Sequence, residues 1–533
     1  MTRTLTIATV NGPAVLDEAD RRRTFAVISH PDAGKSTLTE SLALYSSVIK
    51  DAGVTHGKSS RHGTVSDWMG MEQERGISVS SAALQLSHRG AVLNVVDTPG
   101  HADFSEDSYR VLAAVDFAVM LIDAAKGFEP QTLKLLAVCR RRGLPIITVI
   151  NKWDRPGLEA LDLIDGIEEQ TGMAAVPLTW PTGKAGDFHG LLDLRRHEAV
   201  SLEAVRGGAL PCRERTTALS ELPDGPGLQW AAALEEADLV QATNGGFDRA
   251  AFHGAKQTPV LFTAAAKNFG VRQLLDVLAD LGPGPSARRT TDGGHQPVDA
   301  GFSGFVFKVQ SGQDAAHRDH IAFLRVCSGV FERGMILTNA RLGRPFATKY
   351  AHRVIGRSRE VLDLAWPGDI VGLVNAASLR VGDSLSAEGE VRFPEIPHFA
   401  PELFSVARAV DPGRYKQFRR GITGLEHEGV VQVLRSDRRG DQAPVLAAVG
   451  ALQFEVAQER MAKEFHAPAT FEPLPYTLAM RLGAASTRPP ETFLGGEIMH
   501  RSDGENLVLF TDRWKLEHFR RDNPGLELTT IGS

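Results

Sequence analysis

Residues 29–37 read SHPDAGKST and contain the residue types that hold a phosphate group. An apolar run, Phe25–Ile28, leads into this stretch, and residues 36–44 continue with apolar side chains at helical spacing. In such a strand, loop and helix, backbone N–H groups and a helix N-terminus converge on anionic oxygens. Gly34 lets the backbone approach the phosphates, and Lys35 can reach the β- and γ-phosphates. The sequence therefore predicts a phosphate-binding loop made of Ser29, His30, Pro31, Asp32, Ala33, Gly34, Lys35, Ser36 and Thr37.

One position departs from the usual pattern of such loops, GxxxxGK(S/T), because Ser29 stands where the pattern has glycine. The Ser36 hydroxyl still stands where the pattern places a ligand of Mg²⁺. The alternative interpretation is a solvated turn followed by a capped helix, with Ser36 as the N-cap and Glu40 in the first turn. Motifs farther along the chain decide between the two interpretations.

A second motif, DTPGH at residues 97–101, follows the apolar run Val92–Val96. An aspartate at a strand end can hold Mg²⁺ through water, and this is the role predicted for Asp97. Gly100 offers a backbone N–H to a γ-phosphate and is free to move when that phosphate leaves. His101 is placed to orient an attacking water and is the predicted catalytic residue. An isolated DTPG is more often an ordinary strand-to-helix turn, but its place behind a phosphate loop favours a nucleotide site. The same element contributes Thr98 and Pro99.

A third motif, NKWD, follows the apolar run Ile146–Ile150. The Asp154 carboxylate can accept two hydrogen bonds, from N1–H and the N2 amine of guanine, and adenine does not present this edge. A site of this type discriminates between bases by about 10⁴ to 10⁵ because the wrong base leaves buried polar groups unpaired. Asn151 and Lys152 complete the predicted base site. NKWD alone would be read as a charged strand-end loop, but three such elements at successive strand ends make coincidence improbable.

Between the first two motifs, residues 73–78 read QERGIS and follow a polar, glycine-bearing flank, Gly53–Gly63. This composition predicts a segment that becomes ordered only when ligand is present. Ser78 would supply a second hydroxyl to Mg²⁺ near the γ-phosphate. A lone serine is more often a surface residue, and here its place in the set of motifs supports the metal role.

The elements that must position these motifs are short apolar strands alternating with amphipathic segments. Runs without polar alternation predict strands that are covered on both faces, and hence a parallel sheet with helices on both sides. Ligands bind such sheets at the carboxyl ends of the strands, where all three motifs lie. The predicted strands are Phe25–Ile28, Val92–Val96, Phe117–Ile122, Ile146–Ile150 and Val260–Phe262.

Five segments together resemble the guanine-nucleotide motifs of translational GTPases: SHPDAGKS, RGIS, DTPGHADFSED, NKWD and the late segment TAAA at residues 263–266. The serine in RGIS, the preceding SDWM and the HADFSED continuation resemble the class-2 bacterial release factors within that superfamily. The resemblance covers nearly the whole chain. It extends through residues 304–309, 317–323, 399–404 and 450–454.

This resemblance implies GTP and GDP as ligands and Mg²⁺ as the metal. It implies that Lys35 and Ser36 bind phosphate and metal, and that Ser78 joins the metal shell in the GTP state. Asp97 would support the metal through water, and His101 would position the attacking water. The base would be read by Asn151 and Asp154, with the backbone of Ala264, Ala265 and Ala266 behind it. TAAAK lacks the serine that many GTPases carry there, so only backbone contacts are assigned.

Composition agrees with a globular protein of several domains. The chain has 533 residues, 42% hydrophobic and 23% charged, and a net charge of −6. No apolar run reaches the roughly 18 residues of a membrane span or signal segment, so a cytoplasmic location is expected. Three widely spaced cysteines predict neither a disulfide framework nor a zinc site. Basic clusters such as Arg21–Arg23 and Arg520–Arg521 are read as solvated faces.

The predicted fold class is multi-domain α/β: a P-loop GTPase domain followed by a β-barrel and an α+β domain. Regular short strands with glycine turns predict the barrel, which resembles the second domain of translation factors. The segment at residues 177–259 is too long for one helix and is predicted to be an insert in the first domain. The predicted limits are 1–23, a poorly ordered leader; 24–285, the GTP-binding domain; 286–299, a linker; 300–395, the barrel; and 396–533, the α+β domain.

The resemblance implies a ribosome-stimulated GTPase that helps class-1 release factors leave the ribosome after peptide release. It implies the ribosome as partner and a monomer that binds neither DNA nor membrane. Two alternatives stay open. One is another translational GTPase role, in ribosome rescue or of elongation type, and the absence of the distal domains of elongation factor G counts against translocation. The other is a GTP-gated ribosome-binding module that does not hydrolyse its nucleotide, in which His101 is merely structural.

Overall fold

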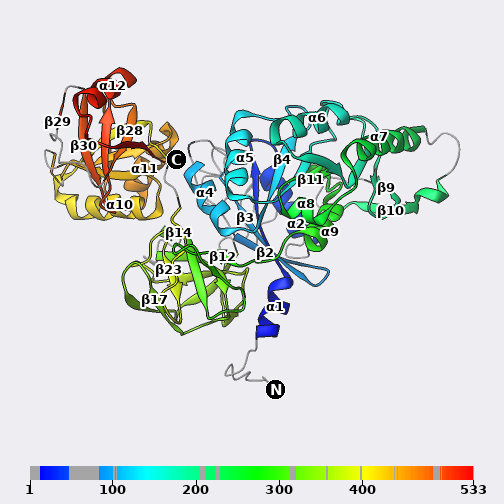
Figure 1. Ribbon diagram of the computed structural model, residues 1–533, viewed down its shortest axis with the longest axis horizontal. Helices are drawn as coiled ribbons and strands as arrows, with labels where there is room; N and C mark the ends of the chain where they lie inside the picture. Colours follow the sequence, from blue (N-terminus) through cyan, green and yellow to red (C-terminus); the bar gives the residue numbers. More distant parts are fainter. Residues whose placement is uncertain are drawn as a thin grey trace.

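A computed structural model describes most of the chain. The described residues are 12–46, 83–99, 103, 105–203, 211–222, 228–311, 320–355, 358–396, 399–436, 439–440, 442–483, 492–493 and 495–531. Figure 1 shows the sheet that carries the predicted motifs on the right, a second, barrel-like body below it, and the C-terminal body on the left.

The first body is built on a seven-stranded sheet in the order β2-β3-β1-β4-β5-β11-β6. Its pairs are parallel, apart from the β2–β3 pair at one edge, which is antiparallel. The predicted parallel sheet is therefore confirmed, with one antiparallel edge strand added. Its strands are β1 (Arg22–Ser29), β2 (Ala83–His88), β3 (Ala91–Asp97), β4 (Phe117–Asp123), β5 (Ile146–Asn151), β6 (Ala174–Pro177) and β11 (Gln257–Phe262).

Helices cover both faces of this sheet because its strands are apolar on both sides. In β1, Ala26 and Ile28 face one core and Phe25 and Val27 face the other, as the alternation of a strand requires. The first core takes its helical side chains from α4 (Ser105–Ala114), α5 (Pro130–Arg142), α6 (Ala160–Thr171) and α7 (Leu228–Asn244). The second takes them from α2 (Lys35–Tyr45), α8 (Arg249–His253) and α9 (Val271–Leu281).

The start of the described chain differs from the expected leader. Residues Gly12–Asp20 form helix α1, in which Val15 and Ala19 are buried. Arg22 lies in β1, and its guanidinium is paired with Asp369 at 2.9 Å, with both side chains under a tenth exposed. The prediction of a poorly ordered leader is therefore wrong for residues 12–23, and Arg22 is not on a solvated face. Local composition did not indicate that Arg22 is buried, because its partner Asp369 lies 347 positions away in the chain.

The segment predicted as an insert contains a four-stranded antiparallel sheet in the order β10-β9-β8-β7, with helix α7 (Leu228–Asn244) packed against it. Trp180 is fully buried there, and its indole N–H donates to Glu236 at 3.1 Å. The strands are β7 (Thr179–Thr182), β8 (Gly190–Asp193), β9 (Glu198–Glu203) and β10 (Arg213–Ala218). The limits of the insert stay a prediction.

The predicted linker is packed rather than free. It folds into a short hairpin of β12 (Arg288–Arg289) and β13 (His295–Gln296). The Arg288 guanidinium lies 5.0 Å from the ring centre of Phe305 and donates to the backbone carbonyl of Ala113. This arginine therefore joins the first body to the second: its guanidinium plane contacts the Phe305 ring, and its N–H group bonds to Ala113.

The second body is an eight-stranded antiparallel sheet in the order β18-β17-β23-β14-β15-β22-β19-β20, with the small pair β16–β21 beside it. It is held against the first sheet by Arg325, which pairs with Asp116 at 2.7 Å, and by Thr24, which donates to the Gly368 carbonyl at 2.6 Å. The strands are β14 (Ser303–Ser311), β15 (His320–Ser328), β16 (Phe331–Glu332), β17 (Ile336–Asn339), β18 (Arg344–Ala347), β19 (Ala351–Ile355), β20 (Ser358–Val361), β21 (Leu364–Ala365), β22 (Ile370–Val374) and β23 (Ser384–Ser386).

In the part of the C-terminal body that the structure describes, three helices cover a nine-stranded sheet, which agrees with the predicted α+β class. Helices α10 (Tyr415–Glu428) and α11 (Ala451–Lys463) share one core with the sheet, and α12 (Arg513–Asp522) shares another. The strands are β24 (Leu403–Ala409), β25 (Gln432–Arg435), β26 (Val445–Ala448), β27 (Ala469–Pro473), β28 (Leu478–Leu482), β29 (Thr492–Phe493), β30 (Gly496–Arg501), β31 (Asn506–Phe510) and β32 (Leu528–Thr530).

Candidate functional site

The predicted motifs meet at one edge of the seven-stranded sheet. Ser29 ends β1, Asp97 ends β3, Asn151 ends β5, and the TAAA segment follows β11. Because these strands are parallel and close together in the order β3-β1-β4-β5-β11, their carboxyl ends face the same side. The edge is therefore where a doubly covered parallel sheet binds its ligand.

The phosphate loop has the backbone that its sequence predicts. Gly34 adopts φ +95° and Asp32 adopts φ +67°, and helix α2 begins at Lys35. Asp32 is one of the few residue types that tolerate this left-handed region. Ser29 lies in extended backbone at the end of β1, and its hydroxyl donates to the His30 carbonyl at 2.9 Å. The missing glycine therefore costs no backbone strain.

Asn151 ties three motifs together. Its amide N–H donates to the Ala33 carbonyl in the phosphate loop at 2.9 Å. Its side-chain oxygen accepts from the Thr263 hydroxyl and from the Ala265 backbone N–H, both at 3.0 Å. The side chain is 2% exposed, so these bonds are protected from water. Asn151 thus positions the phosphate loop against the TAAA segment.

Gly34→Ala tests this contact between motifs. A Cβ at Gly34 would stand 2.6 Å from the Asn151 amide nitrogen, and the left-handed backbone is itself unfavourable for alanine. Strain of about 1–2 kcal/mol and a lost hydrogen bond of about 1 kcal/mol predict roughly 100-fold weaker GTP binding. Titration with a fluorescent GTP analogue measures the change.

Gly143→Ala is the matched control, because Gly143 also has positive φ, +62°, but a Cβ there meets nothing within 4 Å. The control should lose stability without losing GTP affinity. Equal GTP affinities in the Gly34 and Gly143 variants would contradict the assignment of Asn151 as a clamp on the loop.

A buried ion pair joins the first two motifs. Lys35 Nζ lies 3.2 Å from Asp97 Oδ1, and the two side chains are 6% and 2% exposed. The ammonium has no hydrogen-bond acceptor of good geometry among the residues that the structure describes. Beside Asp97, the Thr98 hydroxyl donates to the Val27 carbonyl at 2.7 Å and fixes the start of the DTPGH turn. A buried cation at the loop is suited to anionic oxygens.

The base motif has two neighbours that the sequence analysis missed. Lys152 adopts φ +65° and its Nζ lies 2.8 Å from Asp123 at the end of β4. Burial raises the pKa of the Asp123 carboxyl, but hydrogen bonds from Lys152 and from the Ala125 N–H outweigh it and hold the pKa below its usual value. Asp154 is 3.6 Å from Lys267 Nζ and keeps 11% of its side chain exposed. Asp123 could have been found from the sequence, because it directly follows the apolar run at residues 117–122 and therefore stands at a strand end like the other motifs.

His30 in the phosphate loop is also held by a partner that the sequence did not indicate. Its Nδ1 lies 2.8 Å from Glu129, the N-cap residue of α5. Burial lowers the pKa of His30 more than the Glu129 carboxylate raises it, so the ring is neutral at physiological pH. A neutral ring donates from Nδ1, and this hydrogen bond anchors the loop to the next helix.

Other predicted site residues are placed as follows. Ser36 and Thr37 lie in the first turn of α2 and are partly exposed, Pro99 is buried beyond β3, and Ala266 is exposed beside buried Ala264. Ser78, Gly100 and His101 lie outside the described residues, as do the QERGIS segment and its flank.

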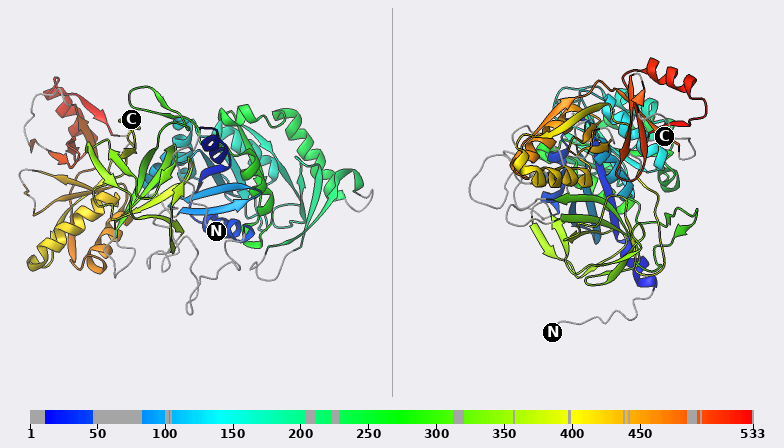
Figure 2. Two further views of the ribbon diagram at one scale, coloured as in Figure 1. Left: turned by 90° about the horizontal axis from the view of Figure 1, so that it is seen from below. Right: turned by 90° about the vertical axis from the view of Figure 1, so that its left-hand side faces the viewer.

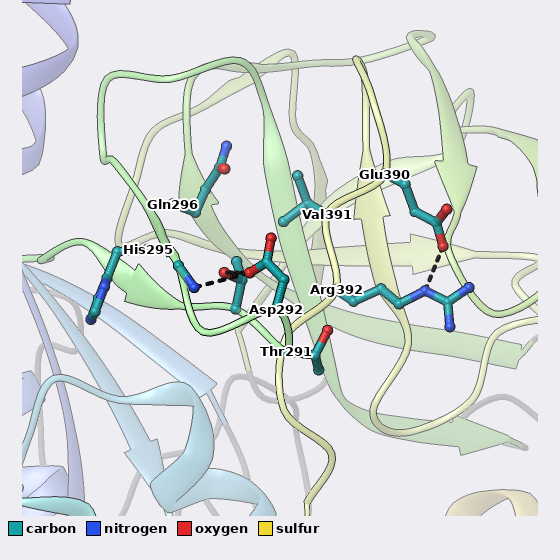
Figure 3. A pocket seen from close by; sticks show the side chains of 9 residues that line it. Thr291, Asp292, His295, Gln296, Glu390, Val391 and Arg392 are labelled. Carbon is teal, nitrogen blue, oxygen red and sulfur yellow. Dashed lines mark hydrogen bonds and ion pairs between the residues drawn. The ribbon is translucent and has the colours of Figure 1, made fainter.

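A separate hollow of about 310 Å³ lies between the β12–β13 hairpin and residues 390–392 (Figure 3). Its charged side chains bond locally: Asp292 accepts from Thr290, and Glu390 accepts from Arg392, both at 2.5 Å. The hollow receives none of the predicted nucleotide-site residues. We therefore place the candidate site at the sheet edge instead.

Comparisons with known proteins agree with this geometry. The profile of the Elongation factor Tu GTP binding domain matches residues 20–283, that of Elongation factor G domain 2 matches 301–388, and that of the Class II release factor RF3, C-terminal domain, matches 393–520. The chain is 43% identical over 529 residues to peptide chain release factor 3 of Synechocystis sp., covering 97% of this chain and 96% of that one.

Two further relatives extend the comparison. Peptide chain release factor 3 of Nitrosomonas eutropha is 46% identical over 484 residues, covering 90% of this chain and 89% of that one. A crystal structure of a protein from Thermus thermophilus is similar in fold, with a TM-score of 0.69 and 21% identity, covering 92% of this chain and 73% of that one.

Proposed function

Because the chain belongs to the peptide chain release factor 3 family, we propose that it promotes the dissociation and recycling of class-1 release factors from the ribosome after peptide release. Membership of this family shows that the chain is a translational GTPase of termination, which binds guanine nucleotide and interacts with the ribosome. The proposal adds that GTP drives the dissociation of class-1 release factors, and it names the residues that couple GTP binding to this step. It also takes the protein to be a cytoplasmic monomer. In the described part of the chain, no helix combines the length and the apolar character needed to cross a membrane.

The observation that carries the proposal is the attachment of helix α4 to the C-terminal body. This helix begins just after the DTPGH motif, where a γ-phosphate would be sensed. Asp103, ahead of α4, accepts a hydrogen bond from the Leu452 N–H at 2.7 Å. Arg110 in α4 donates to the Glu428 carbonyl at 3.0 Å. A shift of α4 would therefore either carry the C-terminal body along or break these contacts and release it.

Glycines allow this close approach. A Cβ at Gly450, the N-cap of α11, would overlap the Asp103 carboxylate, and a Cβ at Gly429 would overlap the Arg110 guanidinium. An aromatic contact adds to the same interface, because Tyr109 and Phe399 meet edge to face with ring centres 4.4 Å apart. The interface is thus specific in both its polar and its apolar contacts.

In the proposed mechanism the chain's own residues bind and orient the nucleotide. The N–H groups of the loop at residues 29–37 and the Lys35 ammonium hold the phosphates, and the Asp154 carboxylate reads guanine. Ser36 and Asp97 offer the hydroxyl and carboxylate oxygens that suit Mg²⁺, which keeps several waters and binds through few protein ligands. When bound, the metal would neutralise charge on the β- and γ-phosphates. His101 would hold the attacking water.

Switching between two domain arrangements has a known energetic requirement. Moving an equilibrium from 1:99 to 99:1 needs about 5.5 kcal/mol of differential binding. Contacts of the γ-phosphate with the segments around Ser78 and Gly100 would supply this difference in the GTP state and lose it on hydrolysis. Helix α4 would pass the change to the C-terminal body through Asp103 and Arg110.

Asp103→Ala tests this route. The loss of a side chain that caps the N-terminus of α11 costs about 1 kcal/mol. We expect GTP affinity to change by less than twofold, whereas the ratio of class-1 factor release rates with GTP and with GDP should fall about fivefold. Asp165→Ala, at an exposed position in α6, is the control and should leave the ratio unchanged. An unchanged ratio for the Asp103 variant would remove α4 from the pathway.

The proposed function itself is tested on termination complexes that carry a labelled class-1 release factor. GTP-bound protein should speed dissociation of the labelled factor, and ribosomes should stimulate GTP hydrolysis while ATP stays inert. Equal release rates with GTP and GDP would overturn the recycling role. Activity in a translocation or rescue assay instead would favour another translational GTPase role. Ribosome binding without stimulated hydrolysis would favour the non-hydrolysing module.

A further inference from the structure

Helix α12 exposes an aromatic surface that the proposed function leaves unused. Trp514 is 63% exposed, and the His518 ring stacks on it in parallel, with ring centres 5.3 Å apart and planes within 5°. The Lys515 ammonium lies 4.7 Å from the indole centre. A large aromatic ring held in this way on a surface is unusual for a residue type that is normally well buried.

The inner side of α12 explains why the outer side is free. Leu516 and Phe519 pack into a core with Met480, Val508 and Phe510, so the helix is anchored by its apolar stripe. Trp514 and His518 stand one helical turn apart on the opposite face and are not needed for that anchoring. In Figures 1 and 2, α12 lies at the outer edge of the C-terminal body.

The charge around this ring pair is positive, although the chain as a whole carries −6. Helix α12 holds four basic residues and two acidic ones. Glu517 is paired with Arg520 at 3.2 Å and Asp522 with His518 at 3.3 Å. Exposed Arg521 follows the two rings at helical spacing, and exposed Arg513 adjoins Trp514 in the chain. The surface thus combines flat stacking groups with cations at its rim.

We propose that this surface, formed by Arg513, Trp514, Lys515, His518 and Arg521, binds an unpaired base and the adjoining backbone of ribosomal RNA. Unpaired RNA bases stack on aromatic rings and guanidinium planes, while cations take up the phosphates. A protein partner would instead favour an apolar rim that excludes water around the central aromatic residue. The rim of Trp514 is charged, which favours RNA. This inference rests on the proposed ribosome-dependent function.

The test uses the full-length protein and 70S ribosomes. Trp514→Ala should weaken ribosome binding about tenfold, because a stacked base contributes roughly that factor or more. Trp514→Phe should retain most of the binding, since it keeps a ring. The double variant Arg513→Glu, Arg521→Glu should lower the slope of log affinity against log salt by about one to two. Leu239→Ala, which alters another exposed side chain on α7, is the control and should bind as the parent does.

Ultraviolet crosslinking on the ribosome identifies the partner. The peptide at residues 513–521 should crosslink to ribosomal RNA, and Trp514→Ala should remove that crosslink. A crosslink to a ribosomal protein, or unchanged ribosome binding by the Trp514 variants, would overturn the inference. If ribosomes neither bind the parent protein nor stimulate its GTP hydrolysis, the proposed function itself would be overturned, so the two failures are distinguishable. Thermal unfolding checks that the exposed substitutions leave the fold intact.

Discussion

Asp154→Asn should exchange the base preference of the protein from guanine toward xanthine. The carboxylate is proposed to accept hydrogen bonds from N1–H and the N2 amine of guanine. An amide offers one acceptor and one donor, which match N1–H and the C2 carbonyl of xanthine. The loss of two charge-assisted hydrogen bonds, each about 1.5–3 kcal/mol, predicts about 10³-fold weaker GTP binding.

The measurement is a competition of GTP, xanthosine triphosphate and ATP for the nucleotide site of each protein. Asp154 suits this role because it keeps 11% of its side chain exposed and has a cation, Lys267, 3.6 Å away. Asp187→Asn, at an exposed position in the insert, is the matched control and should keep the parent's preference. Tight GTP binding by the Asp154 variant would show that another residue reads the base.

His101→Ala should retain GTP affinity and lose ribosome-stimulated hydrolysis by about 10²-fold or more, the usual contribution of a positioned group to proton transfer or water orientation. Affinity survives because the side chain is proposed to touch the attacking water and not the nucleotide. Intrinsic hydrolysis without ribosomes is already slow in GTPases of this type, on the order of 10⁻⁴ s⁻¹, so the loss is measured with ribosomes present.

Two companion variants sharpen this result. His101→Gln should keep part of the stimulated rate, because an amide can also orient a water. His253→Ala, at an exposed position at the end of α8, should hydrolyse GTP as the parent does. Full stimulated turnover by the His101→Ala variant would show that His101 has only a structural role and that another group positions the attacking water.

The sequence alone determined the parts of the protein that depend on local order. Buried parallel strands appear as uninterrupted apolar runs, so β1, β3, β4, β5 and β11 could be predicted within a few residues. The strand, turn and helix around Gly34 and Lys35 could be predicted because their conformation is set within one short stretch of the chain. Fold class and family followed from the same motifs.

Only the tertiary structure decided which distant groups meet. The base role of Asn151 stays a prediction, and the structure adds its bonds to Ala33, Thr263 and Ala265, up to 118 positions away. Residues 12–20 of the expected leader form helix α1, and Arg22 lies in β1, where it pairs with Asp369. Only the tertiary structure likewise shows that Asp103 accepts a hydrogen bond from Leu452 at the start of α11 and that Trp514 is exposed. Local composition carries no signal for such contacts, because burial and partner are properties of the packed bodies and not of neighbours along the chain.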